Sequence, residues 1–393
     1  MRPKRLIFIA PAPLSPTPYC ESALPALARD GWEVTLAAIA PESSALRKVL
    51  PYSCRIIDLG SGDGLRRWLR ELRLLLVILR ARIDRFDVIY LQSNGLAARA
   101  LPLMLVPMLR RSLVYQTLEL VDPVRYPWRA WFEKWLCRRA HLHLNAEYHR
   151  AYIYWTYYRL RSPVIVAPPR LPACWPVPNK SPGVRLRLTN GDPGSFVLIH
   201  HGGSHTHRMT DELLAAFSKL PARFRLVMTG AARTALERVT AKLGLAERVL
   251  LLPSIDMATQ LLYTANADAG LLLYRNTDLG NFFACPGRLG EYTACGLPVL
   301  ASNFTGLEDL VLRFQLGECV DAADPEEIVH GILKLEQGAK EGRYERERIR
   351  NCFLKHLAFD HYEPAICEAF DNLLNPARRR RAAGPPRHWI PGT

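Results

Sequence analysis

Short apolar runs alternate with amphipathic segments along the first half of the chain. The runs that predict strands are Leu6–Ala10, Val34–Ile39, Cys54–Leu59, Val88–Leu91, Leu113–Gln116 and His141–Asn145. Apolar positions at helical spacing predict helices between these runs, for example at Ser22–Asp30 and Leu65–Ile83. Strands that alternate with helices pair in parallel, so this half of the chain is predicted to form a doubly wound α/β sheet.

A proline-rich stretch then interrupts the pattern. From Ala167 to Pro182 the chain reads APPRLPACWPVPNKSP, and because proline lacks a backbone donor we expect a linker there. The alternation resumes with predicted strands at Phe196–His201, Arg225–Thr229, Arg248–Leu252, Ala269–Tyr274 and Val299–Ser302. The predicted helices between them are Asp211–Leu220, Ala231–Leu243, Met257–Ala265 and Leu289–Ala294. Asp324 followed by Pro325 predicts the start of another helix.

The two halves together predict two Rossmann-like, doubly wound parallel-sheet domains of the α/β class. A ligand-binding cleft is expected between them, at the carboxyl ends of the strands. The expected boundaries are residues 1–168 for the first domain, 169–190 for the linker and 191–358 for the second domain. A C-terminal helix at residues 359–376 precedes a tail at residues 377–393, whose five arginines predict a disordered segment, either solvated or tethered to acidic lipid.

The composition adds a strong positive charge. The chain of 393 residues has 52 Lys and Arg against 37 Asp and Glu, a formal net charge of +15, which favours anionic partners. No basic–aromatic motif of the nucleic-acid-binding kind is present, so nucleic acid is not an expected partner. The nine cysteines are scattered singly, which argues against a disulfide framework and a zinc ribbon. The longest uncharged apolar segment, Ala100–Leu109, is too short to span a bilayer, and we expect a cytoplasmic protein.

The most informative side chains lie in the segment HHGGSHTHRM, which begins at His200 and follows a predicted strand. Gly202 and Gly203 allow a ligand to approach the backbone, and Arg208 adds a fork of donors. A diphosphate at a strand–loop–helix junction suits these features. A metal site is not expected, because adjacent histidines in a strand point to opposite faces and the spacing matches no zinc pattern.

A second segment, PGRLGEYTACGLPV, extends from Pro286 to Val299 and ends a helix before a new strand. Together with the glycine–arginine segment, it resembles the sugar-nucleotide-binding domain of retaining glycosyltransferases, specifically glycosyltransferase family 4. The corresponding sequence motif of the family consists of a proline, a small residue, Lys or Arg, an apolar pair, Glu, an aromatic residue, small residues and GxPV. The resemblance covers Phe196–Leu335 and is mainly architectural over residues 1–170.

The resemblance implies the two-domain fold called GT-B, a nucleoside-diphosphate sugar as the donor, and neither a metal nor a cofactor. Glu291 would match the carboxylate that accepts the two ribose hydroxyls, and Arg208 the cation on the diphosphate. Arg288 occupies the family's basic position and is a candidate phosphate contact. The donor-binding residues that the resemblance implies are Gly202, Gly203, Arg208, Gly287, Arg288 and Glu291.

Two positions depart from the family pattern. The upstream member of a glutamate pair that the family often carries is Phe283 here. The His-Glu pair that many relatives have after a first-domain strand reads Leu118-Glu119, so only Glu119 remains. The catalytic candidates are therefore Arg208, Glu291 and Glu119, and the departures leave open an altered acceptor geometry or a weakly active protein.

The predicted helix at residues 65–83 is basic and amphipathic. Its apolar stripe consists of Leu65, Trp68, Leu69, Leu72, Leu75, Leu76 and Leu79. The stripe either packs on the sheet or also lies on an anionic membrane. The segment ALPLMLVPMLRR at Ala100–Arg111 adds a second apolar stretch with a basic end. If the membrane interpretation holds, the protein is peripheral, on the cytoplasmic face of the inner membrane, and acts on a lipid-linked acceptor.

The expected function is that of a hexosyltransferase of polysaccharide biosynthesis. It would move a sugar from a nucleoside-diphosphate donor to a glycan or lipid-linked acceptor with retention of configuration. One alternative is a catalytically silent nucleotide-sugar-binding or scaffold protein of the same fold, which the missing acid and histidine allow. The other is a sugar-nucleotide epimerase, for which the sequence identifies no acidic residues placed to take sugar protons.

Overall fold

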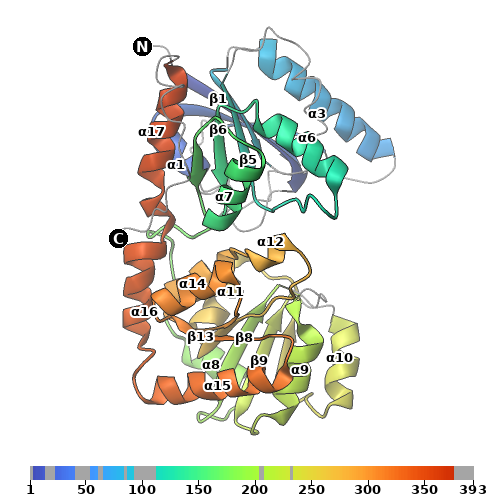
Figure 1. Ribbon diagram of the computed structural model, residues 1–393. Helices are drawn as coiled ribbons and strands as arrows, with labels where there is room; N and C mark the ends of the chain where they lie inside the picture. Colours follow the sequence, from blue (N-terminus) through green and yellow to red (C-terminus); the bar gives the residue numbers. More distant parts are fainter. Residues whose placement is uncertain are drawn as a thin grey trace. The chain divides into compact units, whose positions relative to one another are not determined.

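The computed structural model describes residues 3–13, 23–39, 54–60, 65–83, 86–92, 112–202, 208–230 and 233–375. The chain forms two compact units (Figure 1). Unit 1 consists of Met1–Pro169 and Phe359–Thr393, and unit 2 of Arg170–Ala358. The apolar segment at Ala100–Arg111 and the tail at residues 377–393 lie outside the described residues.

Unit 1 contains a seven-stranded parallel sheet in the order β3-β2-β1-β4-β5-β6-β7. Its strands are β1 (Lys4–Pro13), β2 (Trp32–Ile39), β3 (Arg55–Asp58), β4 (Val88–Gln92), β5 (Ser112–Thr117), β6 (Leu142–Asn145) and β7 (Val164–Val166). The six strands expected in this half are confirmed. The apolar pattern does not predict β7, because its three residues lie between Pro163 and Pro168 and form too short a run.

The helices of unit 1 cover both faces of this sheet. They are α1 (Ala23–Arg29), α3 (Leu65–Ile83), α6 (Pro127–Cys137), α7 (Tyr148–Tyr157) and α17 (Glu363–Leu374). Crossovers between parallel strands are right-handed, so α1, which leads from β1 to β2, lies on one face. The crossover helices α3, α6 and α7, which lead toward β7, lie on the opposite face (Figure 1).

The last helix, α17, belongs to unit 1 although unit 2 precedes it in the chain. The Phe370 ring lies 5.8 Å from the Trp32 ring and 5.5 Å from the Tyr90 ring, measured between centroids. The Ser112 hydroxyl donates to the Leu373 carbonyl at 3.0 Å. The predicted C-terminal helix is therefore part of the first core, beside α1 (Figure 1).

Unit 2 contains a six-stranded parallel sheet in the order β10-β9-β8-β11-β12-β13. Its strands are β8 (Phe196–His201), β9 (Phe224–Thr229), β10 (Val249–Leu252), β11 (Ala269–Leu272), β12 (Val299–Ser302) and β13 (Gly317–Val320). The five strands expected here are confirmed. The apolar pattern does not predict β13, because its sequence GECV contains a polar residue and is short.

The helices of unit 2 follow the expected alternation. They are α8 (Pro182–Thr189), α9 (Thr210–Lys219), α10 (Arg233–Lys242), α11 (Met257–Ala265), α12 (Leu279–Phe282), α13 (Gly287–Ala294), α14 (Thr305–Arg313), α15 (Pro325–Lys340) and α16 (Arg346–Cys352). A π-helical segment at Phe353–Leu357 and a 3₁₀ turn at Phe359–His361 follow α16. The predicted helix start at Asp324 is confirmed, since its carboxylate accepts the Glu326 N–H at 2.8 Å.

The stretch expected to be a linker ends in a helix that is part of unit 2. Pro182 occupies the first turn of α8, where the donor that proline lacks has no helical partner in any case. The Arg185 guanidinium donates to the Asp268 carboxylate at 2.7 Å and to the Ser195 carbonyl at 2.8 Å. Unit 2 thus begins at Arg170, before the boundary at residue 191 that the prolines suggested.

The bounds predicted for α3 are confirmed, but the face on which it packs is not. Leu74 and Ile78 are buried, at 2% and 0% exposure. The exposed residues of the apolar stripe are Trp68 (63%), Leu69 (41%), Leu72 (39%), Leu76 (54%) and Leu79 (36%). Of the two interpretations of this stripe, packing on the sheet is wrong, because Leu74 and Ile78 on the opposite face are the residues that pack there. In the described part of the chain, no helix combines the length and the apolar character that crossing a membrane requires.

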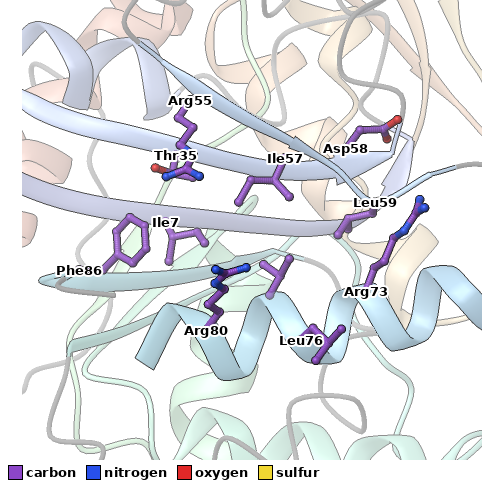
Figure 2. Close-up of a pocket in the computed structure, with 11 residues that line it drawn as sticks. Ile7, Thr35, Arg55, Ile57, Asp58, Leu59, Arg73, Leu76, Arg80 and Phe86 are labelled. Atoms are coloured by element: carbon purple, nitrogen blue, oxygen red, sulfur yellow. The ribbon is translucent and has the colours of Figure 1, made fainter. Parts of the chain in front are cut away.

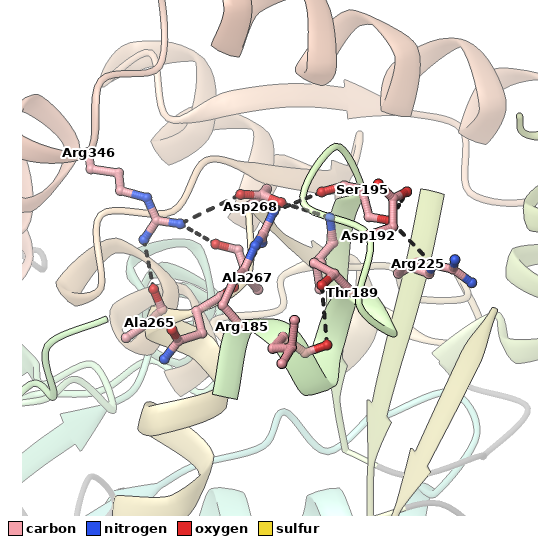
Figure 3. Close-up of polar contacts among 12 residues, drawn as sticks. Arg185, Thr189, Asp192, Ser195, Arg225, Ala265, Ala267, Asp268 and Arg346 are labelled. Atoms are coloured by element: carbon pink, nitrogen blue, oxygen red, sulfur yellow. Dashed lines mark hydrogen bonds and ion pairs between the residues drawn. The ribbon is translucent and has the colours of Figure 1, made fainter. Parts of the chain in front are cut away.

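Asp268 joins several elements at the amino end of the second sheet (Figure 3). Besides binding Arg185, its carboxylate accepts the Val197 N–H at 2.8 Å. Arg346, at the start of α16, lies 4.0 Å from the other carboxylate oxygen and donates to the Ala265 carbonyl at 3.0 Å. One carboxylate therefore holds α8 and the start of β8 and compensates the charge of Arg346.

We expect Asp268→Ala to lower the free energy of unfolding by about 2–3 kcal/mol, because hydrogen bonds to a charged group are lost and two guanidinium groups lose their counter-charge. Urea unfolding followed by circular dichroism measures the change. Asp309→Ala is the matched control, since its 2.6 Å pair with Arg313 joins two partly exposed side chains on one helix. That variant should lose ~0.5 kcal/mol or less, and equal losses for the two variants would contradict the assigned role of Asp268.

Candidate active site

The carboxyl end of β8 lies in the middle of the second sheet, between β9 and β11. After His201 the chain turns at Gly202, whose φ of +108° is in the region that favours glycine. The Gly202 N–H donates to the Thr229 carbonyl at 3.2 Å, which extends the pairing with β9. Gly203 and the loop up to residue 207 lie outside the described residues, and the description resumes at Arg208, just before α9.

His200 and His201 are both buried, and burial lowers the pKa of each imidazole. His201 Nδ1 lies 2.8 Å from the Thr229 hydroxyl, and its Nε2 lies 2.7 Å from the Thr264 hydroxyl on α11. Its ring stacks on the Tyr292 ring at 5.4 Å between centroids. Since a neutral imidazole donates through one nitrogen and accepts through the other, both nitrogens of His201 are engaged. This residue joins β8, β9, α11 and α13.

Two arginines lie close to His200. Burial, together with the positive charges of Arg288 and Arg208, lowers the pKa of His200 to about 3. The Arg208 guanidinium carbon lies 4.3 Å from the centre of the Tyr274 ring, which follows β11. The structure therefore brings the two predicted phosphate-binding cations together at the carboxyl ends of β8 and β11. Because His200 is neutral, the positive charge of this region resides on the two guanidinium groups.

Arg288 packs against the backbone at the end of β8. Gly287 and Arg288 open α13, and Pro286 is the residue that precedes the helix. The Arg288 guanidinium donates to the His201 carbonyl. It also occupies the space that a side chain at Gly202 would need. Residue 202 must therefore be glycine both for its backbone conformation and for the placement of this guanidinium.

Glu291 lies one turn after Arg288 on α13 and is 1% exposed. The Gln260 side-chain amide, on α11, donates to its carboxylate. Burial raises the pKa of Glu291 to about 8, because the ionised carboxylate loses its hydration there. Thr264, on the same helix as Gln260, binds His201, so α11 connects the carboxylate to the strand end. Arg288 and Glu291 are three positions apart on α13, so the two side chains share one face of that helix.

Glu119, the remaining catalytic candidate, belongs to unit 1 and lies two residues after β5. Its side chain is 76% exposed, and a carboxylate oxygen lies 3.5 Å from the Arg150 guanidinium. The same guanidinium donates to the Leu118 carbonyl at 2.6 Å. Arg150 therefore orients the chain at the carboxyl end of β5. Glu119 is in a different unit from the residues on α13.

Sequence reasoning missed a Glu–His pair at the carboxyl end of β6, the strand next to β5. Glu147 caps α7 by accepting the Arg150 N–H at 2.8 Å. Its other oxygen lies 2.6 Å from His149 Nδ1. The carboxylate is buried and the imidazole is half-buried. The available signal is a Glu-x-His spacing directly after a strand, but a glutamate in that position also predicts an ordinary helix cap.

Residues 195–337, which include the whole group of site residues in unit 2, match the family model described as Glycosyl transferases group 1. This segment is a glycosyltransferase group 1 domain, and the chain that contains it is a glycosyltransferase. No curated protein sequence matches the chain.

Solved structures share the fold across both units. HepE of Anabaena in complex with UDP-glucose matches with a TM-score of 0.74 and 17% identity, over 93% of this chain and 99% of that one. Sucrose-phosphate synthase from Thermosynechococcus elongatus matches with 0.73 and 16%, over 94% and 99%. WaaG, a glycosyltransferase involved in lipopolysaccharide biosynthesis, matches with 0.68 and 14%, over 92% and 98%. These likenesses confirm the predicted fold class, two parallel-sheet domains of the GT-B type.

Glu291 makes the stability of the ligand-free protein depend on pH. Its pKa rises from 4.5 to about 8 on folding, so the folded state binds an extra proton between these values. The contribution of Glu291 to the free energy of unfolding is therefore fully present below pH 4.5 and is lost as the pH rises toward about 8. We expect Glu291→Gln, which stays neutral, to raise the melting temperature by about 2 °C or more at about pH 8, and by less at about pH 5.

Thermal unfolding at the two pH values measures this effect. Glu327→Gln on α15 is the control, because Glu327 is exposed. That variant should change the melting temperature little at either pH. A gain in Glu291→Gln that is the same at both pH values would contradict the assigned cause.

Proposed function

We propose that this protein transfers a sugar from a nucleoside-diphosphate donor to a glycan or lipid-linked acceptor, with retention of configuration. One observation carries the proposal. Arg208 and Arg288 both approach His200 at the carboxyl end of β8, and Glu291 lies one turn further along α13. The structural likeness to HepE, which was solved with UDP-glucose, supports this class of donor.

The charges of the site match the two ends of such a donor. Guanidinium groups bind phosphate oxygens through paired hydrogen bonds, so Arg208 and Arg288 would hold the diphosphate. Because glycine has no side chain, the phosphates would approach the backbone closely at Gly202 and Gly203. Gly287 begins α13, where the amides of a first helical turn favour negative charge.

The other end of the donor would bind Glu291. An ionised carboxylate accepts two hydrogen bonds at once, which suits the two neighbouring hydroxyls of a ribose. Burial holds this carboxylate in a defined position on α13, beside Gln260. Ribose hydroxyls would supply hydrogen bonds to the ionised form and so lower its pKa on binding.

The arginines would also lower the barrier to transfer. When the bond between the sugar and the diphosphate breaks, negative charge develops on the departing phosphate, and fixed cations beside it stabilise that charge. We propose that the guanidinium groups supply this charge in place of a metal ion. The departing phosphate oxygen would accept the proton of the incoming hydroxyl on the same face of the sugar, which retains the configuration. Glu119, exposed in unit 1, would help orient the acceptor.

The donor assignment predicts the effect of two substitutions. Glu291→Ala and Arg208→Gln should each weaken UDP-sugar or GDP-sugar binding by at least about tenfold, because each removes charged hydrogen bonds to the donor. Calorimetry measures donor affinity, and incubation with labelled donor and a membrane extract measures transfer. Arg238→Gln, at an exposed position on α10, is the matched control and should bind normally.

Unchanged donor affinity in both site variants would contradict the donor assignment. Donor binding by the unaltered protein without any transfer would instead favour a catalytically silent nucleotide-sugar-binding protein, for which the phenylalanine at position 283 is the supporting observation.

We further propose that unit 1 docks on an anionic membrane surface through α3. The apolar stripe of this helix is exposed, and a row of large apolar side chains at helical spacing marks an interaction face. Arg66, Arg73 and Arg80 are exposed on the same helix, and each basic residue near an anionic surface contributes about 1 kcal/mol. The protein would then act at the cytoplasmic face of the membrane, where a lipid-linked acceptor is accessible.

Vesicle flotation tests the membrane proposal. The protein should float with phosphatidylglycerol vesicles at low salt, and the double variant Trp68→Ser, Leu72→Ser should bind them about tenfold more weakly, because apolar area no longer leaves water. Leu312→Ser in unit 2 is the matched control, since Leu312 is 54% exposed on α14. No flotation of the unaltered protein, or an equal loss in the control, would count against docking through α3.

A further inference from the structure

Unit 1 contains a cavity of about 390 Å³ between α3 and the strands β1, β2 and β3 (Figure 2). Its lining includes none of the residues assigned above to the donor or the acceptor. Apolar side chains from both sides form most of its wall, among them Ile7 on β1, Ile57 on β3 and Val77 on α3. Phe86, just before β4, closes one end (Figure 2). The volume lies within the range of small-molecule binding sites.

Three guanidinium groups also line this cavity. Figure 2 shows Arg73 and Arg80 rising from α3 toward the strands, with Arg55 on β3 across from them. Asp58 is the acidic residue of the lining, and its carboxylate accepts the Gly60 N–H at 2.9 Å in a turn. Within the described ranges, no ion pair joins Arg55, Arg73 or Arg80 to a carboxylate. The cavity therefore combines an apolar wall with an excess of positive charge.

This combination restricts the class of ligand. A purely apolar ligand would fill the wall but make no use of the three guanidinium groups, which are exposed to water. A small free anion would satisfy the charge but leave the apolar wall in contact with water. Both requirements are met by a molecule that has one apolar chain and an anionic head group, because guanidinium groups bind phosphate oxygens in paired hydrogen bonds.

We propose that this cavity binds an anionic amphiphile of the alkyl phosphate class. The chain lies among Ile7, Ile57 and Val77, and the phosphate binds Arg80 together with Arg55 or Arg73. The site adjoins the exposed stripe of α3 at Leu76, which also lines the cavity, whereas Leu72 of the stripe lies outside the lining. The site is independent of the transferase activity proposed for unit 2. Bound ligand adds to the contacts of Leu74 and Ile78, the buried residues of α3 among those whose side chains the structure describes.

Calorimetry on the full chain tests this proposal, with decyl phosphate below its micelle concentration as the probe. Decyl maltoside has the same chain with a neutral head, and inorganic phosphate has the head without the chain. Decyl phosphate should bind at least about tenfold more tightly than either comparison compound, since both parts of the cavity contribute. Arg80→Gln should weaken its binding by about tenfold, because a charged hydrogen-bond donor is lost.

Two further variants locate the binding site. Val77→Trp fills the cavity and should abolish binding of decyl phosphate, provided that circular dichroism shows a folded protein. Leu72→Ser, on the exposed stripe, and Arg66→Gln, outside the lining, should bind it normally. The proposal is overturned if decyl maltoside binds equally well, if Arg80→Gln keeps full affinity, or if Leu72→Ser loses as much affinity as Arg80→Gln. Normal donor binding by Arg80→Gln would separate this site from the one in unit 2.

Discussion

The group of site residues in unit 2 depends on the packing of Arg288 against the end of the central strand. Its guanidinium donates to the His201 carbonyl and fills the space beside Gly202, which fixes the first turn of α13 on β8. Glu291 follows one turn later and is positioned by the same contact. His201, held between hydroxyls of β9 and α11, fixes the strand end in turn. The candidate site is therefore built on the rigid sheet and its helices, while the loop contributes Arg208.

Each unit contains a buried carboxylate, but one is a structural group of the core and the other belongs to the candidate site. In unit 1, Glu133 is fully buried and its pKa rises to about 8, as that of Glu291 does. Glu133 accepts hydrogen bonds from Tyr115 at 3.0 Å and from Tyr158 at 3.3 Å, within a core of aromatic side chains. It is a structural group whose partners belong to the fold. Glu291 lies one turn after Arg288 on the helix that packs against the end of β8, so a raised pKa gains functional meaning only from its surroundings.

The sequence predicts the fold well because hydrophobic periodicity and fold are closely linked in parallel α/β proteins. It misses β7 and β13, since each is short and one contains a polar residue. It also cannot tell which face of α3 is buried. Two aliphatic residues suffice to seat that helix, and the longer apolar stripe on its other side is the stronger signal. Which face of α3 is buried depends on the neighbouring strands and not on the helix sequence itself.

The same distinction holds for the candidate site. Arg208, Arg288 and Glu291 lie within local motifs; the structure places the two arginines near His200 and Glu291 one turn after Arg288 on α13. Gln260 and Thr264, which hold Glu291 and His201, come from a helix with no recognisable motif. His149 was missed for a similar reason, because its partner Glu147 has the position of a helix cap. Motifs identify groups that meet a ligand, whereas the supporting contacts form only when distant segments fold together.

The discontinuous composition of unit 1 has a consequence for the order of folding. Lys4 on β1 and Asp371 on α17 form a 2.7 Å ion pair although 367 positions separate them in the chain. Unit 2 is one continuous segment, so a ribosome releases all of its strands before α17 emerges. A folded unit 2 shortens the effective loop between the two parts of unit 1 and reduces the entropy lost when they meet. Until then Trp32 and Tyr90 lack the ring of Phe370, so part of the apolar surface of the nascent first sheet stays uncovered during synthesis.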